Sequence, residues 1–303
     1  MVAALNLAIT GGTGFVGQRL LDCALAQGHQ IRALTRRPQA PRDGVTWVEG
    51  ALDRPDRLAA LVKSTDAVIH VAGVVNATDE AGFEAGNVIG TGAILAAAEQ
   101  AGIERFVHVS SLAAREPQLS LYGASKARSE ALVAASPLST AVVRPPAIYG
   151  PGDREILEMF KMAVRGFVLL PPAGRLSLIH VNDLASLLLT LASSSETSVT
   201  EPDDGRAGGW THREFGEALG VAVRRKVRLV SMPRLILAAA ARADRLARGA
   251  KAKLTPDRAS YFSHPDWVAD PARAPASWHA ATPTPQGLSD TAAWYLAQGW
   301  LKY

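Results

Sequence analysis

The sequence predicts an α/β fold in which a doubly wound parallel sheet is followed by a smaller C-terminal lobe. Short, continuously apolar strands alternate with helical patterns over roughly the first half of the chain. The first strand runs directly into a glycine cluster, and the alternation weakens after Arg144-Pro145-Pro146. The 303 residues, 48% apolar and 20% charged, suffice for one large domain or two unequal ones.

The elements of the sheet follow in order. Residues 5–10 read as a short buried strand, and apolar residues at helical spacing predict a helix over 15–27, which Gly28 ends. A second strand is expected at 30–35. The later strands are expected at 45–48, 67–72, 105–110 and 139–144, and the helices between them at 55–63, 88–101 and 122–135. Continuous apolar strands of this kind indicate a sheet covered by helices on both faces.

Two domains are expected. The first spans 1–150, with a strand near 176–182 that returns to its sheet, and the second comprises most of 151–303. Elements of the second are expected at 153–165, 183–193 and 211–219 as helices, and at 176–181 and 226–231 as strands. The stretch 233–253 is apolar at first and basic later, which fits either a helix closing over the second lobe or a helix on a membrane surface.

Composition excludes several classes of protein. The net charge is +4, and the basic residues do not interleave with aromatics, so no nucleic-acid partner is expected. A single cysteine, Cys23, excludes an internal disulfide, and the seven histidines lack ligand spacing, so no metal site is expected. No secretory signal and no run of ~20 apolar residues is visible. We therefore expect no stable membrane insertion and a cytoplasmic location.

The first strand opens into Gly-Gly-Thr-Gly-Phe-Val-Gly at 11–17. Glycines spaced by three let the chain turn sharply, approach a pyrophosphate closely and seat the next helix against the sheet. The N-terminus of that helix supplies N–H groups and the positive end of its dipole. This context predicts a dinucleotide-binding domain of the Rossmann type over 1–150, with a merely structural turn as the alternative. The predicted contacts are Gly11, Thr13, Gly14, Phe15, Val16 and Gly17.

The end of the second strand indicates which dinucleotide binds. An acidic residue there holds the ribose hydroxyls of NAD, whereas an arginine accommodates the 2′-phosphate of NADP. Arg36 and Arg37 follow Thr35, and no acidic residue appears before Asp43. Two guanidiniums suit a phosphate dianion. NADP(H) is therefore the preferred cofactor, with NAD(H) as the alternative. If Arg36 and Arg37 have no binding role, they are a solvated pair on the surface.

The candidate chemical centre combines a strand end with a helix. The strand at 105–110 ends near Ser111, and Tyr122 and Lys126 lie one turn apart on the helix that follows. A phenol has an ordinary pKa near ~10, and a neighbouring ammonium would lower it toward neutral pH. Tyr122 could then exchange a proton with an alcohol or ketone while Ser111 orients the reacting oxygen. The alternative is a helix-start aromatic with a solvated lysine.

The ordered set of motifs resembles the extended short-chain dehydrogenase/reductase (SDR) superfamily, in particular its NAD-dependent epimerase/dehydratase-like branch. The matching pieces are the segments 11–17, 70–73, 87–91, 109–111, 122–126, 144–145, 148–152 and 179–185. The segments 294–295 and 299–301 resemble the terminal helix of the same group. The resemblance implies an NAD(P)H-dependent oxidoreductase that transfers a hydride between nicotinamide and an alcohol or ketone. It implies Ser111, Tyr122 and Lys126 as the catalytic trio. It assigns further cofactor contacts to Leu52, Ala72, Gly73, Ser110, Lys126 and Pro145.

Two departures from the family pattern bear on the substrate and the cofactor. Gly50-Ala51-Leu52 stands where the family often has Gly-Asp-Leu, so an adenine contact is missing or falls to Asp53. The loop between Ser111 and Tyr122 lacks the Val-Tyr-Gly common in sugar-nucleotide enzymes. A small-molecule substrate of unassigned identity is expected, and the family suggests a homodimer packed through the helices 88–101 and 122–135. The rival hypotheses are a nucleotide-sugar epimerase or dehydratase and a non-catalytic cofactor-binding sensor or assembly protein.

Overall fold

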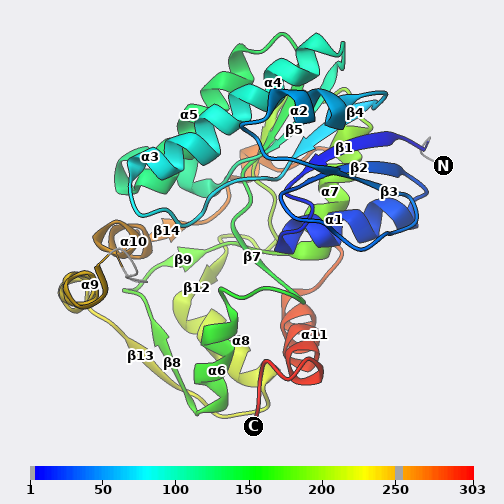
Figure 1. The fold of residues 1–303 in the computed structure, drawn as a ribbon. Coiled ribbons are helices and arrows are strands. Elements are labelled where there is room, and N and C mark those ends of the chain that lie inside the picture. Colours follow the sequence, from blue (N-terminus) through cyan, green and yellow to red (C-terminus); the bar gives the residue numbers. More distant parts are fainter. Residues whose placement is uncertain (1–3, 250–254) are drawn as a thin grey trace. The chain divides into compact units, whose positions relative to one another are not determined.

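The computed structural model describes residues 4–249 and 255–303, which form two compact units. Unit 1 comprises Met1–Pro145 and Leu184–Thr200, and unit 2 comprises Pro146–Asp183 and Glu201–Tyr303. Figure 1 shows the elements of both units. The chain crosses from unit 1 after Pro145, five residues before the expected boundary at 150, and the segment 184–200 returns to unit 1.

Unit 1 is built on a parallel sheet of seven strands in the order β11-β6-β5-β4-β1-β2-β3. The strands are β1 (Asn6–Thr10), β2 (Gln30–Thr35), β3 (Val45–Glu49), β4 (Ala67–His70), β5 (Arg105–Val109), β6 (Ser139–Val143) and β11 (Val199–Thr200). The predicted fold class, a doubly wound parallel sheet, is confirmed. The strands β4 and β5 are buried along their whole length, as expected for strands covered on both faces.

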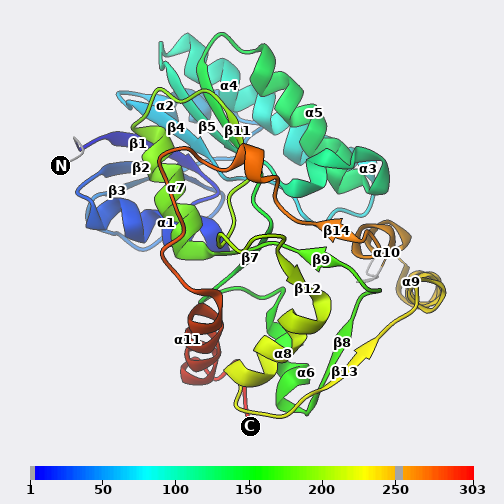
Figure 2. The same cartoon turned by 180° about the vertical axis from the view of Figure 1, so that it is seen from behind.

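Helices cover both faces of this sheet. Their bounds are α1 (Phe15–Ala26), α2 (Pro55–Val62), α3 (Glu80–Phe83), α4 (Gly90–Gln100), α5 (Leu121–Ala135) and α7 (Val181–Ala192). Figures 1 and 2 show α2, α4 and α5 on one face, and α1 with the later part of α7 on the other. The first face buries Leu58, Ile94 and Val133 against Val68 and Phe106 of the sheet.

The expected strand near 176–182 does not return to the sheet of unit 1. Its central part is β10 (Leu178–His180), which pairs in parallel with β7 (Ala147–Tyr149) in unit 2. The returning strand is β11 instead, with Val199 opposite Val142 of β6. The prediction was wrong because a short apolar run indicates a buried strand without indicating its partner.

Unit 2 surrounds a core of its own, which includes Tyr149, Phe160, Leu219, Leu288 and Tyr295. Its other elements are α6 (Leu157–Val164), β8 (Phe167–Leu170), β9 (Arg175–Leu176), β12 (Trp210–Thr211), α8 (His212–Ala222), β13 (Arg228–Ser231), α9 (Arg234–Arg248), α10 (Pro256–Phe262), β14 (Asp266–Trp267) and α11 (Thr284–Ala297). The helix considered for 233–253 is α9, and residues 250–253 lie outside the described part of the chain. Within that described part, no helix is both long and apolar enough to cross a bilayer.

Candidate active site

The predicted site residues of unit 1 gather at one edge of its sheet. Gly11 follows β1, Gly73 follows β4, Ser111 follows β5, and Pro145 follows β6. These four strands are successive neighbours in the order β6-β5-β4-β1, and parallel neighbours end at the same edge. Arg36 and Leu52, which follow the next strands β2 and β3, continue the same edge.

The turn between β1 and α1 requires its glycines. Gly11 has a φ of +76°, and a Cβ added there would lie 2.7 Å from the backbone nitrogen of Ala72. A Cβ on Gly17 would collide with the carbonyl oxygen of Gly11. Gly14 is the N-cap of α1 and has no side chain to accept from the first-turn amides, and that turn holds no acidic residue. Because these glycines carry no side chains, the backbone of the turn stays accessible to an anion such as a pyrophosphate.

The end of β2 presents the two predicted arginines. Arg36 and Arg37 directly follow Thr35, the last residue of β2, and both are exposed. The Thr35 hydroxyl donates a 2.6 Å hydrogen bond to the Arg37 carbonyl oxygen, which fixes the course of the backbone here. Since β2 lies beside β1, the pair stands next to the glycine turn. Two cations at this position could hold a phosphate on the adenosine ribose.

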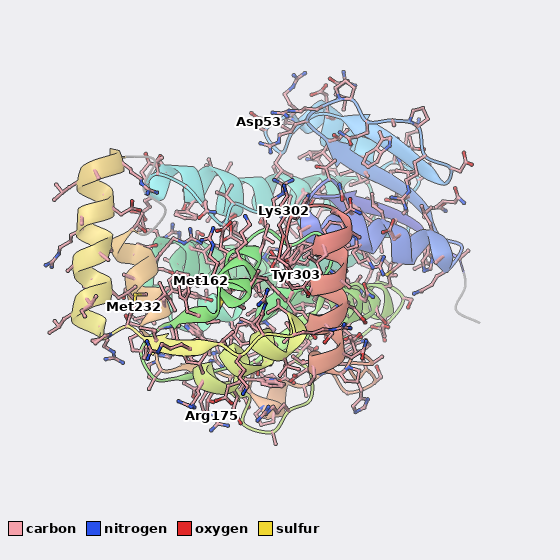
Figure 3. The ribbon with its side chains drawn as sticks, turned by 90° about the horizontal axis from the view of Figure 1, so that it is seen from below. Asp53, Met162, Arg175, Met232, Lys302 and Tyr303 are labelled. Carbon is pink, nitrogen blue, oxygen red and sulfur yellow. The ribbon has the colours of Figure 1, made fainter. Side chains whose placement is uncertain are left out.

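Leu52 and Asp53 follow β3. Leu52 is partly buried and packs close to Gly90 of α4, where an added Cβ would lie 2.7 Å from Leu52 Cδ1. Asp53 is exposed and is labelled in Figure 3. An apolar side chain beside an exposed carboxylate could receive an adenine ring and its amino group.

The structure brings Ser111 and Tyr122 together through a hydrogen bond between their side chains. Ser111 caps a short 3-10 helix, η2 (Leu112–Arg115), by accepting from the Ala113 amide at 3.2 Å. Tyr122 is the second residue of α5, whose N-cap Ser120 accepts from the Gly123 amide at 3.0 Å. A Cβ on Gly123 would lie 2.6 Å from the Ala113 carbonyl oxygen. Gly123 thus lets η2 approach α5 closely enough for the two hydroxyls to meet.

The protonation of Tyr122 differs from the expectation. Burial of its hydroxyl raises the pKa above that of an ordinary phenol, and the hydrogen bond with Ser111 offsets part of this rise. The expectation that Lys126 lowers the pKa of Tyr122 toward neutral pH is therefore wrong for this structure. Desolvation disfavours the phenolate more than the hydrogen bond favours it. At neutral pH the Tyr122 hydroxyl is therefore protonated.

Lys126 lies deep in the site, 4% exposed, and its Nζ donates a 2.8 Å hydrogen bond to the Val109 carbonyl oxygen at the end of β5. Burial lowers the pKa of Lys126 to about 8, while the nearby Glu130 carboxylate acts to raise it. Gly73 gives the ammonium room, because a Cβ there would stand 3.2 Å from Lys126 Nζ. The ammonium can therefore form contacts on the side of Gly73.

Glu130 was not singled out from the sequence. Its carboxylate accepts from the Ser110 hydroxyl at 2.5 Å and from Arg144 Nε at 2.9 Å and Nη2 at 2.6 Å. The Ser110 side chain, predicted as a cofactor contact, is therefore directed to Glu130. The signal was present in the spacing, since Tyr122, Lys126 and Glu130 follow one another at intervals of four along one face of α5.

Asn87 is a second residue without a predicted role. It is 1% exposed and lies in the π-helical stretch η1 (Glu84–Ile89). Its side chain accepts from the Val74 amide at 2.6 Å and donates to the Val74 carbonyl at 2.9 Å and to Ser125 Oγ at 2.8 Å. Asn87 therefore ties the segment after β4, which contains Gly73, to helix α5. A π-helical turn inside a helix often marks a functional site.

The two strand histidines belong to the core of unit 1. His70 is fully buried and hydrogen-bonded to Thr10 Oγ1 at 2.6 Å and to Thr91 Oγ1 at 3.0 Å, and burial lowers its pKa to about 3. His108 is likewise buried and bonded to Ser129 Oγ at 3.0 Å. Both are neutral at physiological pH. Among the residues that the structure describes, no group of three His, Cys, Asp or Glu side chains could hold a metal ion.

Unit 2 contains a pocket of about 380 Å³. Its lining includes the apolar residues Leu170, Pro171, Ala173 and Leu229, with the polar side chains of Arg175 and His212. Arg175 is labelled in Figure 3. A pocket with this lining suits an apolar group that ends in, or lies beside, a polar one.

Comparison with known proteins finds relatives over almost the whole chain. The family model described as "NAD dependent epimerase/dehydratase family" matches residues 7–202. "Ceramide reductase" of Caulobacter vibrioides (strain NA1000 / CB15N) is 40% identical over 311 residues, covering 97% of this chain and 96% of that protein.

Solved structures share the fold. The human epimerase family protein SDR39U1 (isoform 2) with NADPH matches with a TM-score of 0.76 at 21% identity, covering 95% of this chain and 99% of that one. The Bordetella bronchiseptica enzyme WbmG in complex with NAD and UDP matches with a TM-score of 0.75 at 19% identity, covering 99% of this chain and 97% of that one.

Proposed function

The chain belongs to the NAD dependent epimerase/dehydratase family and is an NAD(P)-dependent oxidoreductase, and we propose that it reduces a ketone to an alcohol with Tyr122 as the proton donor. The observation that carries this proposal is the hydrogen bond between Ser111 and a Tyr122 hydroxyl whose pKa is raised by burial. A protonated phenol suits the reductive direction, because the oxygen of a reduced carbonyl must gain a proton.

The nicotinamide cofactor supplies a hydride to the carbonyl carbon. We propose that the turn of Gly11, Gly14 and Gly17 holds the pyrophosphate of the cofactor. Support comes from the close contacts that added Cβ atoms at Gly11 and Gly17 would make with the neighbouring backbone, so the turn requires glycine. Ser111 and Tyr122 donate hydrogen bonds to the substrate oxygen and fix its position. As negative charge develops on that oxygen, the Tyr122 hydroxyl gives up its proton to it and becomes a phenolate. The buried Lys126 ammonium stabilises this phenolate electrostatically.

NADPH is the proposed reductant. Support comes from Arg36 and Arg37 beside the glycine turn and from the lack of an acidic residue between them and Asp43. Carboxylates that would bind free ribose hydroxyls are thus missing from this stretch, whereas two guanidiniums would pair with a 2′-phosphate. The further cofactor contacts that we propose are those of Thr13, Phe15, Val16, Leu52, Ala72, Lys126 and Pro145.

The proposed substrate is a ketone on a lipid of the ceramide class. Support comes from the relative named ceramide reductase, which aligns over nearly the full length of both proteins. The apolar pocket of unit 2 also suits part of a long hydrocarbon chain better than it suits a charged nucleotide. We further propose a cytoplasmic homodimer packed through α4 and α5, where Leu132 is 38% exposed, and light scattering would test its mass.

The experiment that tests this function measures cofactor oxidation with the full chain. NADPH and NADH are supplied in parallel, with a detergent-dispersed ceramide-class ketone and with short water-soluble ketones as comparison. The proposal predicts stoichiometric NADPH loss that is fastest with the lipid ketone. A nucleotide-sugar epimerase would instead interconvert its substrate without net NADPH loss, and that result would refute the proposal.

A further inference from the structure

We propose that α9 is a docking surface that binds the face of a bilayer containing anionic phospholipids. The inference rests on the proposed function, because a ceramide-class substrate resides in a membrane. Its structural basis is the outward side of α9, which carries large apolar side chains next to arginines.

The outward side of α9 is apolar. Leu235 is 85% exposed, Leu246 is 88% exposed and Ile236 is 56% exposed. Leu235 and Leu246 are eleven residues apart, which is close to three turns of an α-helix, so they project in nearly the same direction. Ala239 and Ala243 lie between them on that side, and Arg242 borders it, about 20° from Leu235 around the helix axis. We call Leu235, Ile236, Ala239, Ala243 and Leu246 the apolar face of α9.

The opposite side of α9 secures the helix to unit 2. Leu237 is 3% exposed and Ala241 is fully buried, and both pack with Ala259 of α10 and with Met232. Figure 3 labels Met232 at one end of α9. The helix thus has a second, separate hydrophobic side that is already buried in a small cluster with α10. The apolar face is left to water, where large exposed apolar patches commonly mark an interaction site.

The charges on α9 favour an anionic surface as the occupant. Arg234, Arg242, Arg245 and Arg248 oppose a single acid, Asp244, so the helix carries four positive charges and one negative charge. Asp244 pairs with Arg248 at 3.1 Å. At 100° per residue, Arg242 and Arg245 flank the apolar face along one side. Helices that lie in a bilayer interface combine an apolar face with flanking cations in this way.

A second copy of the chain is a less suitable occupant. An antiparallel pair of α9 helices joined by their apolar faces would place the two rows of arginines side by side, and like charges in contact oppose association. A bilayer of anionic lipids neutralises the same arginines instead. Docking would also hold the pocket of unit 2 near the lipid, because Leu229 and Ser231 of β13 line that pocket three to five residues before α9 begins.

The test is sedimentation of the full chain with vesicles. One set is phosphatidylcholine alone, and the other contains equal parts of phosphatidylcholine and phosphatidylglycerol. We expect binding to the anionic vesicles that weakens with added salt. The double variant Leu235→Ser/Leu246→Ser and the double variant Arg242→Gln/Arg245→Gln should each lower the bound fraction about tenfold. The matched controls are Val221→Ser on α8 and Arg224→Gln just after it, whose side chains are also exposed, and they should bind as wild type does.

Enzyme assays separate this inference from the proposed function. The Leu235→Ser/Leu246→Ser variant should reduce detergent-dispersed ketone at the wild-type rate and vesicle-embedded ketone about tenfold more slowly. Reduction in detergent without any vesicle binding by wild type would overturn the docking surface and leave the function standing. Vesicle binding by wild type without reduction of any ketone would overturn the proposed function and leave the docking surface standing. A change from dimer to monomer in the variant, without wild-type vesicle binding, would assign the apolar face to a second copy and overturn the proposal.

Discussion

The Lys126 ammonium donates a 2.8 Å hydrogen bond to the Val109 carbonyl oxygen, which anchors helix α5 to the last residue of β5. The same strand end leads into Ser110 and Ser111. One short segment therefore carries a partner for Lys126, a partner for Glu130 and the hydroxyl that meets Tyr122. The end of β5 therefore sets the position of the Tyr122 hydroxyl relative to the Lys126 ammonium.

Activity should fall as the pH rises through about 8, because burial lowers the pKa of Lys126 to about 8 and deprotonation removes the charge that stabilises the Tyr122 phenolate. Glu130 raises this pKa, so Glu130→Gln should move the alkaline limb of kcat to lower pH. The pH profile of kcat with saturating NADPH measures the shift. Glu84→Gln, which removes a carboxylate paired with Arg128 instead, is the control. An unmoved alkaline limb in Glu130→Gln would show that Glu130 acts only on the fold.

The same lysine affects stability in a defined direction. Its folded-state pKa of about 8 lies below the ordinary value of 10.5, so between these pH values the unfolded chain holds a proton that the folded chain has lost. The contribution of Lys126 to the free energy of unfolding therefore rises as the pH increases from about 8 to 10.5. Denaturant titrations across this range, compared between wild type and Lys126→Met, isolate that contribution. Equal pH dependence in both proteins would contradict the lowered pKa.

Tyr122→Phe should lower kcat by about 100-fold or more while NADPH affinity stays near the wild-type value. The substitution removes the hydroxyl that supplies the proton in the proposed reaction. It keeps the aromatic ring, which packs against Phe83 with ring centroids 6.2 Å apart. Single-turnover kinetics and fluorescence titration with NADPH measure the two quantities separately. Retention of activity in Tyr122→Phe would remove the proton donor from the mechanism.

Arg36→Ala should raise the Kd for NADPH about 10- to 100-fold and leave the Kd for NADH nearly unchanged, since a charge-assisted hydrogen bond to phosphate contributes about 1.5–3 kcal/mol. Arg19→Ala, which removes an exposed arginine from α1, is the matched control. Isothermal titration with both cofactors gives the comparison. A similar loss for NADH and NADPH would mean that Arg36 does not contact the 2′-phosphate.

Gly17→Ala should abolish dinucleotide binding, because the new Cβ would collide with the Gly11 carbonyl oxygen and displace the turn from α1. Gly92→Ala in α4 is the control, since the nearest atom to its added Cβ is Leu132 Cδ1 at 3.7 Å, an ordinary contact. That substitution should raise the free energy of unfolding by up to about 1 kcal/mol through helix propensity. Thermal unfolding with and without NADPH measures both effects. Cofactor-dependent stabilisation of Gly17→Ala would contradict the role of the turn.

Much of this architecture could be predicted from the sequence because it depends on local signals. Apolar strand runs predicted the parallel sheet, and the interval of four placed Tyr122 and Lys126 on one face of α5. The partner of β10 could not be predicted, since pairing depends on segments far apart in the chain. The pKa of Tyr122 was missed for a similar reason. Its direction depends on how deeply the hydroxyl is buried, which spacing along a helix does not reveal.

The apolar face of α9 illustrates the same limit. Sequence alone indicated a helix that is first apolar and then basic. Which side of that helix packs inward depends on Leu237 and Ala241 meeting Ala259 of α10, a contact between separate helices. That contact turns Leu235 and Leu246 toward the surface, and the sequence does not reveal their exposure.

In the proposed reaction a hydride passes from NADPH to a ketone carbon. The most direct measurement supplies NADPH deuterated at the transferable position of its nicotinamide, with a ceramide-class ketone, and follows the product by mass spectrometry. We expect one deuterium on the carbinol carbon for each NADPH oxidised. A product without deuterium, or turnover of substrate with the NADPH pool unchanged, would contradict it.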